Sequence, residues 1–178
     1  MELFDVIDSK GNPAGQIVSR KKPMQKEFPT EQLTYGLFGK RGQSTDSLQK
    51  RSQNKDSFPG KFDTSSAGHI QAGDEPLESA LRELKEELGI SATPEQLHFA
   101  GTFPISFAKE FHGKMFRDEE IAFVYIYQEP VNTAELVLQT EEVEEVQWFD
   151  LEEVYEQCGK RREIFCVPEG AWEWCGVI

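Results

Sequence analysis

The sequence predicts a single α/β domain of ordinary size. Its 178 residues are 38% hydrophobic and 11% aromatic, which is enough to fill one core. Residues 121–127 and 146–149 are rich in β-branched and aromatic side chains and predict core strands. Two other segments carry apolar residues at helical spacing and predict amphipathic helices. We therefore expect the helices to pack on a sheet.

The two helices have recognisable ends. Asp74, Glu75 and Pro76 mark the start of the first helix, and Gly89 marks its end. Its expected buried stripe consists of Leu77, Leu81, Leu84 and Leu88. The second helix is expected over residues 151–158, with Gly159 and the basic residues 160–162 at its carboxyl end.

The first third of the chain gives weaker signals. A small β-hairpin is expected at about residues 3–19, where two apolar runs flank the turn-forming residues 8–13. Residues 21–63 are polar and basic, with one alternating segment around Leu33 to Leu37 that predicts a strand. Residues 39–46 are expected to form a loop.

Charge and composition exclude several classes of function. A net charge of −13 disfavours bulk binding to nucleic acid or to an anionic membrane, although an acidic protein can bind a phosphate through a bridging cation. No apolar run is long enough to span a membrane, and no secretory pattern opens the chain, so we expect a soluble, cytoplasmic protein. Cys158, Cys166 and Cys175 include no C-x-x-C pair and are expected to be reduced thiols.

Three glutamates of the first helix are candidate metal ligands. Glu83, Glu86 and Glu87 lie at i, i+3 and i+4, so their carboxylates project from one helix face. Their mutual repulsion is relieved when Mg²⁺ or Mn²⁺ sits among the oxygens. Arg82, four residues before Glu86, can hold that carboxylate in place. Taken alone, the pattern is also typical of a solvated helix face.

The residues around these glutamates supply a family resemblance. The stretch reads Gly68-His69-Ile70-Gln71-Ala72-Gly73-Asp74, then seven residues, then Arg82-Glu83-Leu84-Lys85-Glu86-Glu87-Leu88-Gly89-Ile90. Residues 68–90 thus resemble the Nudix box, G-x5-E-x7-R-E-U-x-E-E-x-G-U with U aliphatic, except that Asp74 replaces the first glutamate. Outside the box, residues 48–63 and 65–69 are similar to the Nudix branch that resembles isopentenyl-diphosphate isomerase.

The resemblance implies a fold and a metal site. The implied fold is a Nudix-like α/β/α sandwich with a mixed β-sheet, in a single domain spanning residues 1–178. The helix that carries the Nudix box would cover one face of the sheet, and the helix at residues 151–158 would cover another. The implied metal ligands are Glu83, Glu86, Glu87 and the Gly68 carbonyl, with Mg²⁺ or Mn²⁺ as the cofactor. Arg82 would orient the carboxylates and Asp74 would support them. Glu86 or Glu83 would be the catalytic base for attack of water on phosphorus.

Residues outside the glutamate cluster are candidates for substrate contact. Lys50 and Arg51 could anchor a phosphate, and His69 could touch one, although a solubilising basic edge and a structural histidine explain them as well. Phe107 belongs to an expected pocket loop, residues 107–116. A carboxylate from outside the box could come from residues 118–120, which include Glu120, or from residues 141–142, against the alternative of a solvated turn.

One departure from the resemblance bears on the reaction. True isopentenyl-diphosphate isomerases carry a catalytic cysteine just ahead of the metal site, where residues 61–67 here read Lys-Phe-Asp-Thr-Ser-Ser-Ala. Serine is a weak replacement for a thiolate, so we expect hydrolysis of a phosphoanhydride bond in a nucleoside diphosphate derivative or similar organic diphosphate. The alternatives are an isomerase of a prenyl diphosphate and a non-catalytic, nucleotide-sensing module. A homodimer is compatible with the sequence.

Overall fold

A computed structural model describes residues 3–8, 11–19, 30–38, 45–111, 114–158, 160 and 163–168. For residues 30–38, 107, 109, 111, 114–118, 155 and 158 the description covers the backbone alone. The strands are β1 (Leu3–Ile7), β2 (Pro13–Ser19), β3 (Thr30–Phe38), β4 (Thr45–Arg51), β5 (Phe62–Asp63), β6 (Ser66–His69), β7 (Leu97–Phe111), β8 (Lys114–Tyr127) and β9 (Val143–Asp150). The α-helices are α1 (Pro76–Leu88) and α2 (Leu151–Cys158).

The sheet is mixed, as the family resemblance implies. Strand β3 pairs in parallel with β8 along its length, and antiparallel with β6 and β4. Strand β9 extends the sheet beyond β4, and β7 extends it beyond β8, both by antiparallel pairing. Strands β1 and β2 pair antiparallel over the segment where a hairpin is expected, and Val6 of β1 meets Thr30 of β3.

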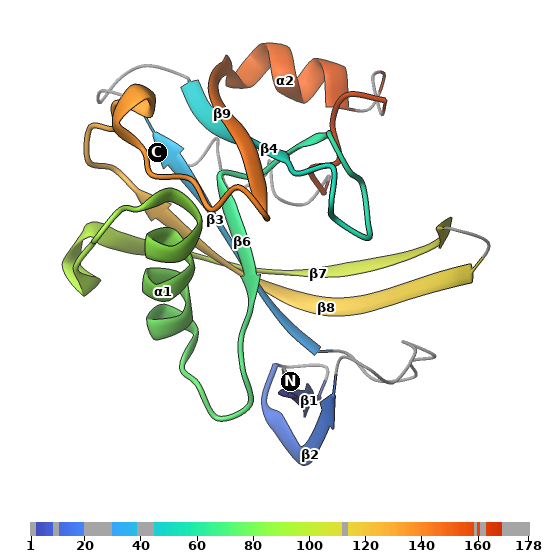
Figure 1. Cartoon of the computed structure of the whole chain (residues 1–178). Helices are drawn as coiled ribbons and strands as arrows, with labels where there is room; N and C mark the ends of the chain where they lie inside the picture. The colour runs from blue at the N-terminus through green and yellow to red at the C-terminus, as the bar shows by residue number, and fades with distance from the viewer. Residues whose placement is uncertain are drawn as a thin grey trace.

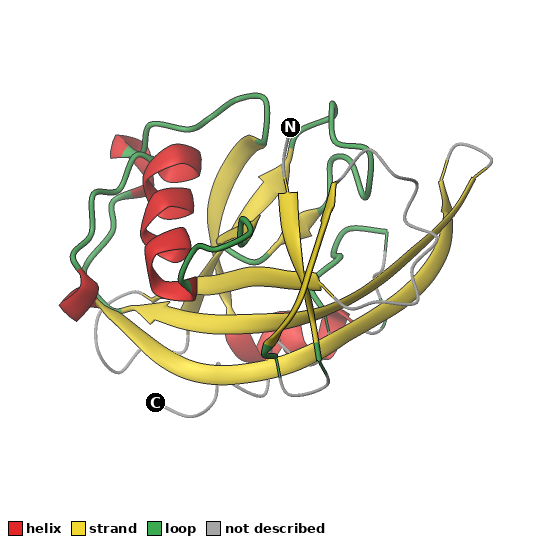
Figure 2. Cartoon of the chain, turned by 90° about the horizontal axis from the view of Figure 1, so that it is seen from below, coloured by secondary structure: helices red, strands yellow, loops and turns green. Residues whose placement is uncertain are grey.

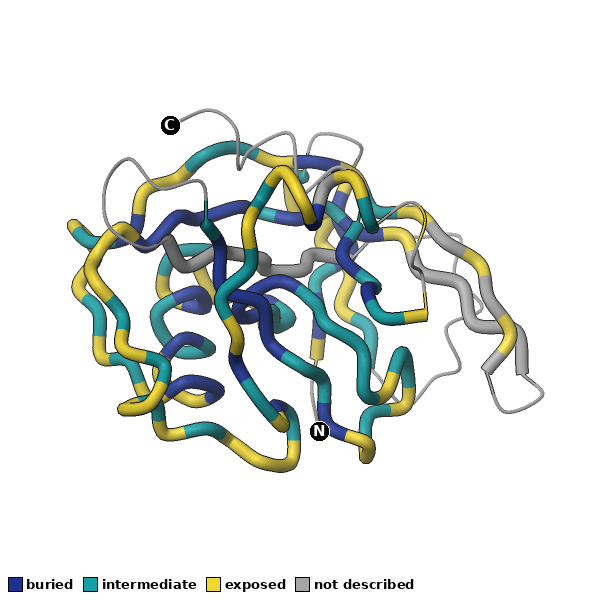
Figure 3. Tube along the Cα trace, turned by 90° about the horizontal axis from the view of Figure 1, so that it is seen from above, coloured by how far each residue is buried: buried dark blue, intermediate teal, exposed yellow. Residues whose placement is uncertain are grey.

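Helices α1 and α2 cover opposite faces of this sheet. Successive side chains of a strand point to opposite faces, and β8 sends Tyr125 and Tyr127 into the core under α1 but Ala122 and Val124 into the core that contains Val154 of α2. Figure 1 shows α1 beside β6 and α2 over the β4 and β9 end of the sheet. Figure 3 shows the buried residues concentrated between these layers. The predicted α/β/α sandwich is confirmed.

Two expectations about loops are wrong. Residues 107–111 and 114–116, expected to form a pocket loop, belong to β7 and β8, which pair continuously from Leu97 with Tyr127 to Phe111 with Lys114. Figure 2 shows this hairpin as a long curved arm that extends beyond the body of the domain. Thr45 and Asp46, also expected in a loop, open β4 because they pair with Asp150 and Phe149 of β9.

Membrane-crossing helices are not found in the parts of the chain that the structure describes, because no helix there has the necessary length and hydrophobicity.

Candidate metal centre

Helix α1 positions the acidic cluster. Pro76 opens the helix and Gly89 ends it in a left-handed conformation (φ 73°), with its backbone N–H donating to the carbonyl of Lys85. Leu84 and Leu88 are fully buried, whereas Leu77 and Leu81 pack at the edge of the same core. With this stripe fixed, Glu87 turns inward and Glu86 stays exposed, although the two are neighbours in sequence.

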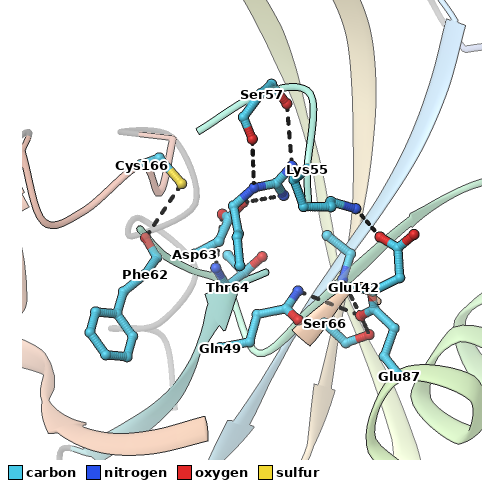
Figure 4. A network of polar contacts seen from close by, with 12 residues as sticks. Gln49, Lys55, Ser57, Phe62, Asp63, Thr64, Ser66, Glu87, Glu142 and Cys166 are labelled. Carbon is cyan, nitrogen blue, oxygen red and sulfur yellow. Dashed lines mark hydrogen bonds and ion pairs between the residues drawn. The ribbon is translucent and has the colours of Figure 1, made fainter. Parts of the chain in front are cut away.

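Glu87 is the most deeply buried acid of the cluster, with 3% of its surface exposed. Its Oε2 accepts hydrogen bonds from the Ser66 hydroxyl, from the backbone N–H of Ala67 at 3.2 Å and from Nε2 of Gln49 at 3.5 Å. Figure 4 shows Gln49, Ser66 and Glu87 together at the end of a longer polar network that contains Lys55 and Glu142. Burial raises the pKa of Glu87 to about 7, and the neighbouring charge of Glu83 adds to this effect.

Glu83 lies against the backbone of β6. A Cβ atom added to Gly68 would lie 2.2 Å from the carboxyl carbon of Glu83, so a residue with a side chain at position 68 would displace this carboxylate. Burial raises the pKa of Glu83, and the hydrogen bond from Arg82 acts in the opposite direction. Glu83 and the Gly68 backbone, both predicted metal ligands, are therefore brought into direct contact.

Arg82 contacts a different glutamate from the one expected. Its Nη2 donates to Oε1 of Glu83 at 3.2 Å and to the carbonyl of His69 at 3.3 Å, and its Nη1 donates to Oδ2 of Asp74 at 2.7 Å. The expected contact with Glu86 is absent from the described interactions, because the guanidinium extends back toward the 69–74 loop. Arg82 thus ties Asp74 and Glu83 to the loop.

Glu120 of β8 is a buried carboxylate from outside the box. Its side chain has no exposed surface, its Oε1 lies 3.1 Å from Nε2 of His69, and its Oε2 has no hydrogen-bond partner among the described residues. The ring of Phe4 lies 4.9 Å from the His69 ring, centroid to centroid, so the N-terminal hairpin supports this histidine. Sequence reasoning did not identify this contact, since Phe4 is separated from His69 by most of the poorly patterned region.

The predicted phosphate anchors are already engaged by protein groups. Arg51 donates to the Ser57 carbonyl and hydroxyl and to Oδ2 of Asp63, and only 13% of its side chain is exposed. Lys50 forms an ion pair with Glu144 at 2.9 Å, and this hydrogen bond raises the pKa of Lys50. Phe107 lies on the β7 arm, and its side chain is outside the described residues.

The acidic side chains suit a hard divalent cation. Glu87 and Glu120 are buried, yet the described residues give neither carboxylate an ion pair with lysine or arginine, and one oxygen of Glu120 is unpartnered. Such burial is unfavourable unless positive charge is supplied. No group of three or more acidic, histidine or cysteine side chains among the described residues is already arranged as a metal cage. The fit therefore rests on the oxygen chemistry of the donors.

Gln49 and Ser66 are further residues that sequence reasoning did not assign. Both are buried polar residues on strands, 2% and 0% exposed, and both contact Glu87. A polar residue at a buried strand position could have identified both residues as functional. The sequences of β4 and β6 do not show which of their residues face the interior, so this feature could not be used.

Comparison with known proteins gives the family. Residues 32–166 match the model of the NUDIX domain. The chain is 36% identical over 143 residues to an uncharacterized Nudix hydrolase of Clostridium acetobutylicum, covering 80% of this chain and 66% of that protein. It is 32% identical over 159 residues to another from Yersinia pestis, covering 89% of this chain and 78% of that protein. The matches thus span about two thirds or more of these relatives' own lengths.

Solved structures share the fold. A crystal structure from Deinococcus radiodurans superimposes with a TM-score of 0.72 at 18% identity and covers 98% of this chain and 99% of that one. The NUDIX domain of Shewanella oneidensis NrtR, crystallised with ADP ribose, has a TM-score of 0.53 at 19% identity and covers 77% of this chain and 82% of that one. With the box residues gathered around α1 and β6, the chain belongs to the Nudix hydrolase family.

Proposed function

We propose that this protein hydrolyses a phosphoanhydride bond in a nucleoside diphosphate derivative or a similar organic diphosphate, with Mg²⁺ or Mn²⁺ as cofactor. The cation would be held by Glu83, Glu86, Glu87 and the Gly68 carbonyl. The observation that carries the proposal is the close packing of Glu83 on the Gly68 backbone beside the buried Glu87. Two buried or half-buried carboxylates at one backbone site are stabilised by a cation that their own chain does not supply.

The acidic residues of the site and Arg82 would have distinct parts in this reaction. A bound cation would supply positive charge against the charge that develops on the leaving phosphate, and would favour a nucleophile derived from water. Glu86, which is exposed, or Glu83 would accept the proton of the attacking water. Arg82 would fix the Glu83 carboxylate through its contact at 3.2 Å, and Asp74 would fix Arg82 in turn.

Substrate contacts follow from the same geometry. Glu120 and His69 would face the substrate or its cation as a pair, because the unpartnered Oε2 of Glu120 remains available for a further interaction. Lys50 would reach a phosphate by exchanging its ion pair with Glu144. Arg51 would act on the same phosphate less directly, because its guanidinium holds Ser57 and Asp63. Phe107 on the β7 arm stays a proposed wall of the pocket.

The substrate class is tested by product release. Pure protein is incubated with nucleoside di- and triphosphates, nucleotide sugars, ADP-ribose, diadenosine tetraphosphate and isopentenyl diphosphate, with Mg²⁺ or Mn²⁺ or with chelator. ADP-ribose and the dinucleotide are included because fold neighbours are an ADP-ribose complex and a Caenorhabditis elegans Ap4A hydrolase. We expect chelator-sensitive release of phosphate or a nucleoside monophosphate from one class. Binding without turnover would favour a sensing module, and formation of the allylic isomer would favour an isomerase.

A further inference from the structure

The two oxygens of Glu87 have different surroundings. All three described donors, the Ser66 hydroxyl, the Ala67 N–H and the Gln49 amide, converge on Oε2. Among the described residues no donor reaches Oε1. Within the described part of the chain, the carboxylate is thus held by hydrogen bonds through Oε2, whereas Oε1 receives none.

The donors come from two strands that close around the helix. Gln49 lies on β4 and Ser66 on β6, whereas Glu87 lies on α1. Gln49, Ser66 and Glu87 are 2%, 0% and 3% exposed, so water does not compete for these hydrogen bonds. Figure 4 shows the Gln49 amide and the Ser66 hydroxyl both directed at the Glu87 carboxylate. This arrangement restricts rotation of the carboxylate about its last bond.

We propose that Gln49 and Ser66 are positioning residues that present Oε1 of Glu87 to the divalent cation. The inference rests on the proposed function, in which Glu87 is a metal ligand. A carboxylate with both oxygens bonded by its own protein would have little to offer a cation, whereas one held through a single oxygen is a directed ligand. The buried amide oxygen of Gln49 has no hydrogen-bond partner among the described residues, which is a cost that stability alone does not explain.

The test uses Mn²⁺ alone, so that ligand geometry is measured without turnover. Mn²⁺ affinity is determined by electron paramagnetic resonance titration for the wild type, Gln49→Met, Ser66→Ala and Ser66→Thr. Gln49→Met keeps the volume and removes the amide, and Ser66→Thr keeps the hydroxyl. Ser47→Ala is the matched control, because Ser47 is a fully buried serine of β4 whose hydroxyl donates to Ser65 and has no described hydrogen bond to Glu87. Thermal unfolding of every variant identifies any that fail to fold.

We expect Gln49→Met and Ser66→Ala to bind Mn²⁺ roughly 10- to 100-fold more weakly, the usual effect of losing a partner of a metal ligand. Ser66→Thr should recover most of the affinity and Ser47→Ala should keep all of it. Turnover of the weakened variants should approach the wild-type value at saturating Mn²⁺, because the ligands themselves remain. A merely structural role would lower thermal stability and leave the Mn²⁺ affinity unchanged.

Different outcomes would contradict the positioning role and the proposed function. If Glu87→Gln loses Mn²⁺ affinity while Gln49→Met and Ser66→Ala keep it, the positioning role is overturned and the metal site stands. If Glu87→Gln itself binds Mn²⁺ like the wild type, Glu87 is not a ligand, and the inference is overturned together with that part of the proposed function. If Ser66→Ala does not fold, Gln49→Met decides the question.

Discussion

Glu87 and Glu120 are two buried carboxylates that the protein stabilises in different ways. Glu87 comes from helix α1 and receives three hydrogen bonds on one oxygen. Glu120 comes from strand β8, contacts His69 through one oxygen and leaves the other without a partner among the described residues. The protein itself therefore holds the Glu87 side of the site, whereas on the Glu120 side one carboxylate oxygen is left for the proposed cation or substrate.

The largest effect is expected from removing either charge. Glu87→Gln and Glu120→Gln should each lower turnover roughly 100- to 1000-fold in the presence of Mn²⁺, because in the proposed function both carboxylates hold the cation that offsets the charge of the reacting phosphate. Steady-state kinetics with the best substrate of the panel measures this. Glu78→Gln and Glu119→Gln are matched controls, since each is an exposed glutamate on the same element and should retain activity. Near-normal turnover of Glu120→Gln would restrict the catalytic charge to the helix side.

The second effect concerns stability without cation. The folded-state pKa of Glu87, about 7, lies above its ordinary value of 4.5. A raised pKa means that the folded state binds the proton more tightly, so this contribution to stability is complete below about pH 4.5 and is lost as the pH rises through about 7. We compare the free energy of unfolding of Glu87→Gln with that of the wild type, both in chelator. This difference should favour the variant by roughly 3 kcal/mol more at pH 8 than at pH 4.5.

Urea unfolding at several pH values in chelator measures this stability difference. Adding Mg²⁺ at pH 8 should stabilise the wild type more than the variant, because the cation replaces the proton on the carboxylate. Glu78→Gln should show no such pH dependence. A constant difference between Glu87→Gln and wild type at all pH values would show that burial does not penalise this charge.

A smaller effect is expected where the helix side meets the backbone. In Gly68→Ala the added Cβ would lie 2.2 Å from the carboxyl carbon of Glu83, so the flexible glutamate side chain must move away. We expect turnover to fall roughly 10- to 100-fold with a small loss of stability. Gly15→Ala is the contrasting variant, because its Cβ would meet open space but its φ of 76° is strained. It should lose about 1 kcal/mol of stability and keep its turnover.

The local elements could be predicted well from sequence. Helix α1 ends at Leu88 and helix α2 covers residues 151–158 as expected, because apolar spacing and Gly89 act within a few residues. The grouping of the box glutamates on one face follows from the same spacing. The difference between exposed Glu86 and buried Glu87 does not, because it depends on the side from which β6 approaches the helix.

Long-range pairing explains the remaining errors. The sequence predicts a loop at residues 107–116, at the end of the β7–β8 arm, because the charged residues there hide the alternation that strand pairing creates. The contacts of Gln49 and Ser66 with Glu87, and of Phe4 with His69, join residues 21 to 65 positions apart, and no local pattern encodes them. In these cases tertiary packing, and not propensity, decides the environment of a side chain.

The smallest effect is expected at the strand side of the site, where the N-terminal hairpin supports Glu120 through two contacts in series. Phe4 is 1% exposed and packs on the His69 ring, and His69 in turn contacts Glu120. Phe4→Leu removes the ring contact and should cost about 1 kcal/mol of stability. If His69 then loses its fixed orientation, turnover should fall roughly fivefold, the equivalent of a similar free energy in the barrier.

Parallel measurements of thermal unfolding and steady-state kinetics separate the two consequences of Phe4→Leu. Leu3→Ala is the control, because Leu3 is 41% exposed and its backbone carbonyl would still accept the N–H of Ala72. A loss of stability with unchanged turnover would mean that Phe4 only attaches the hairpin to the domain. Glu120 would then be held by His69 and the sheet alone, and the strand side of the site would need no support from the N-terminus.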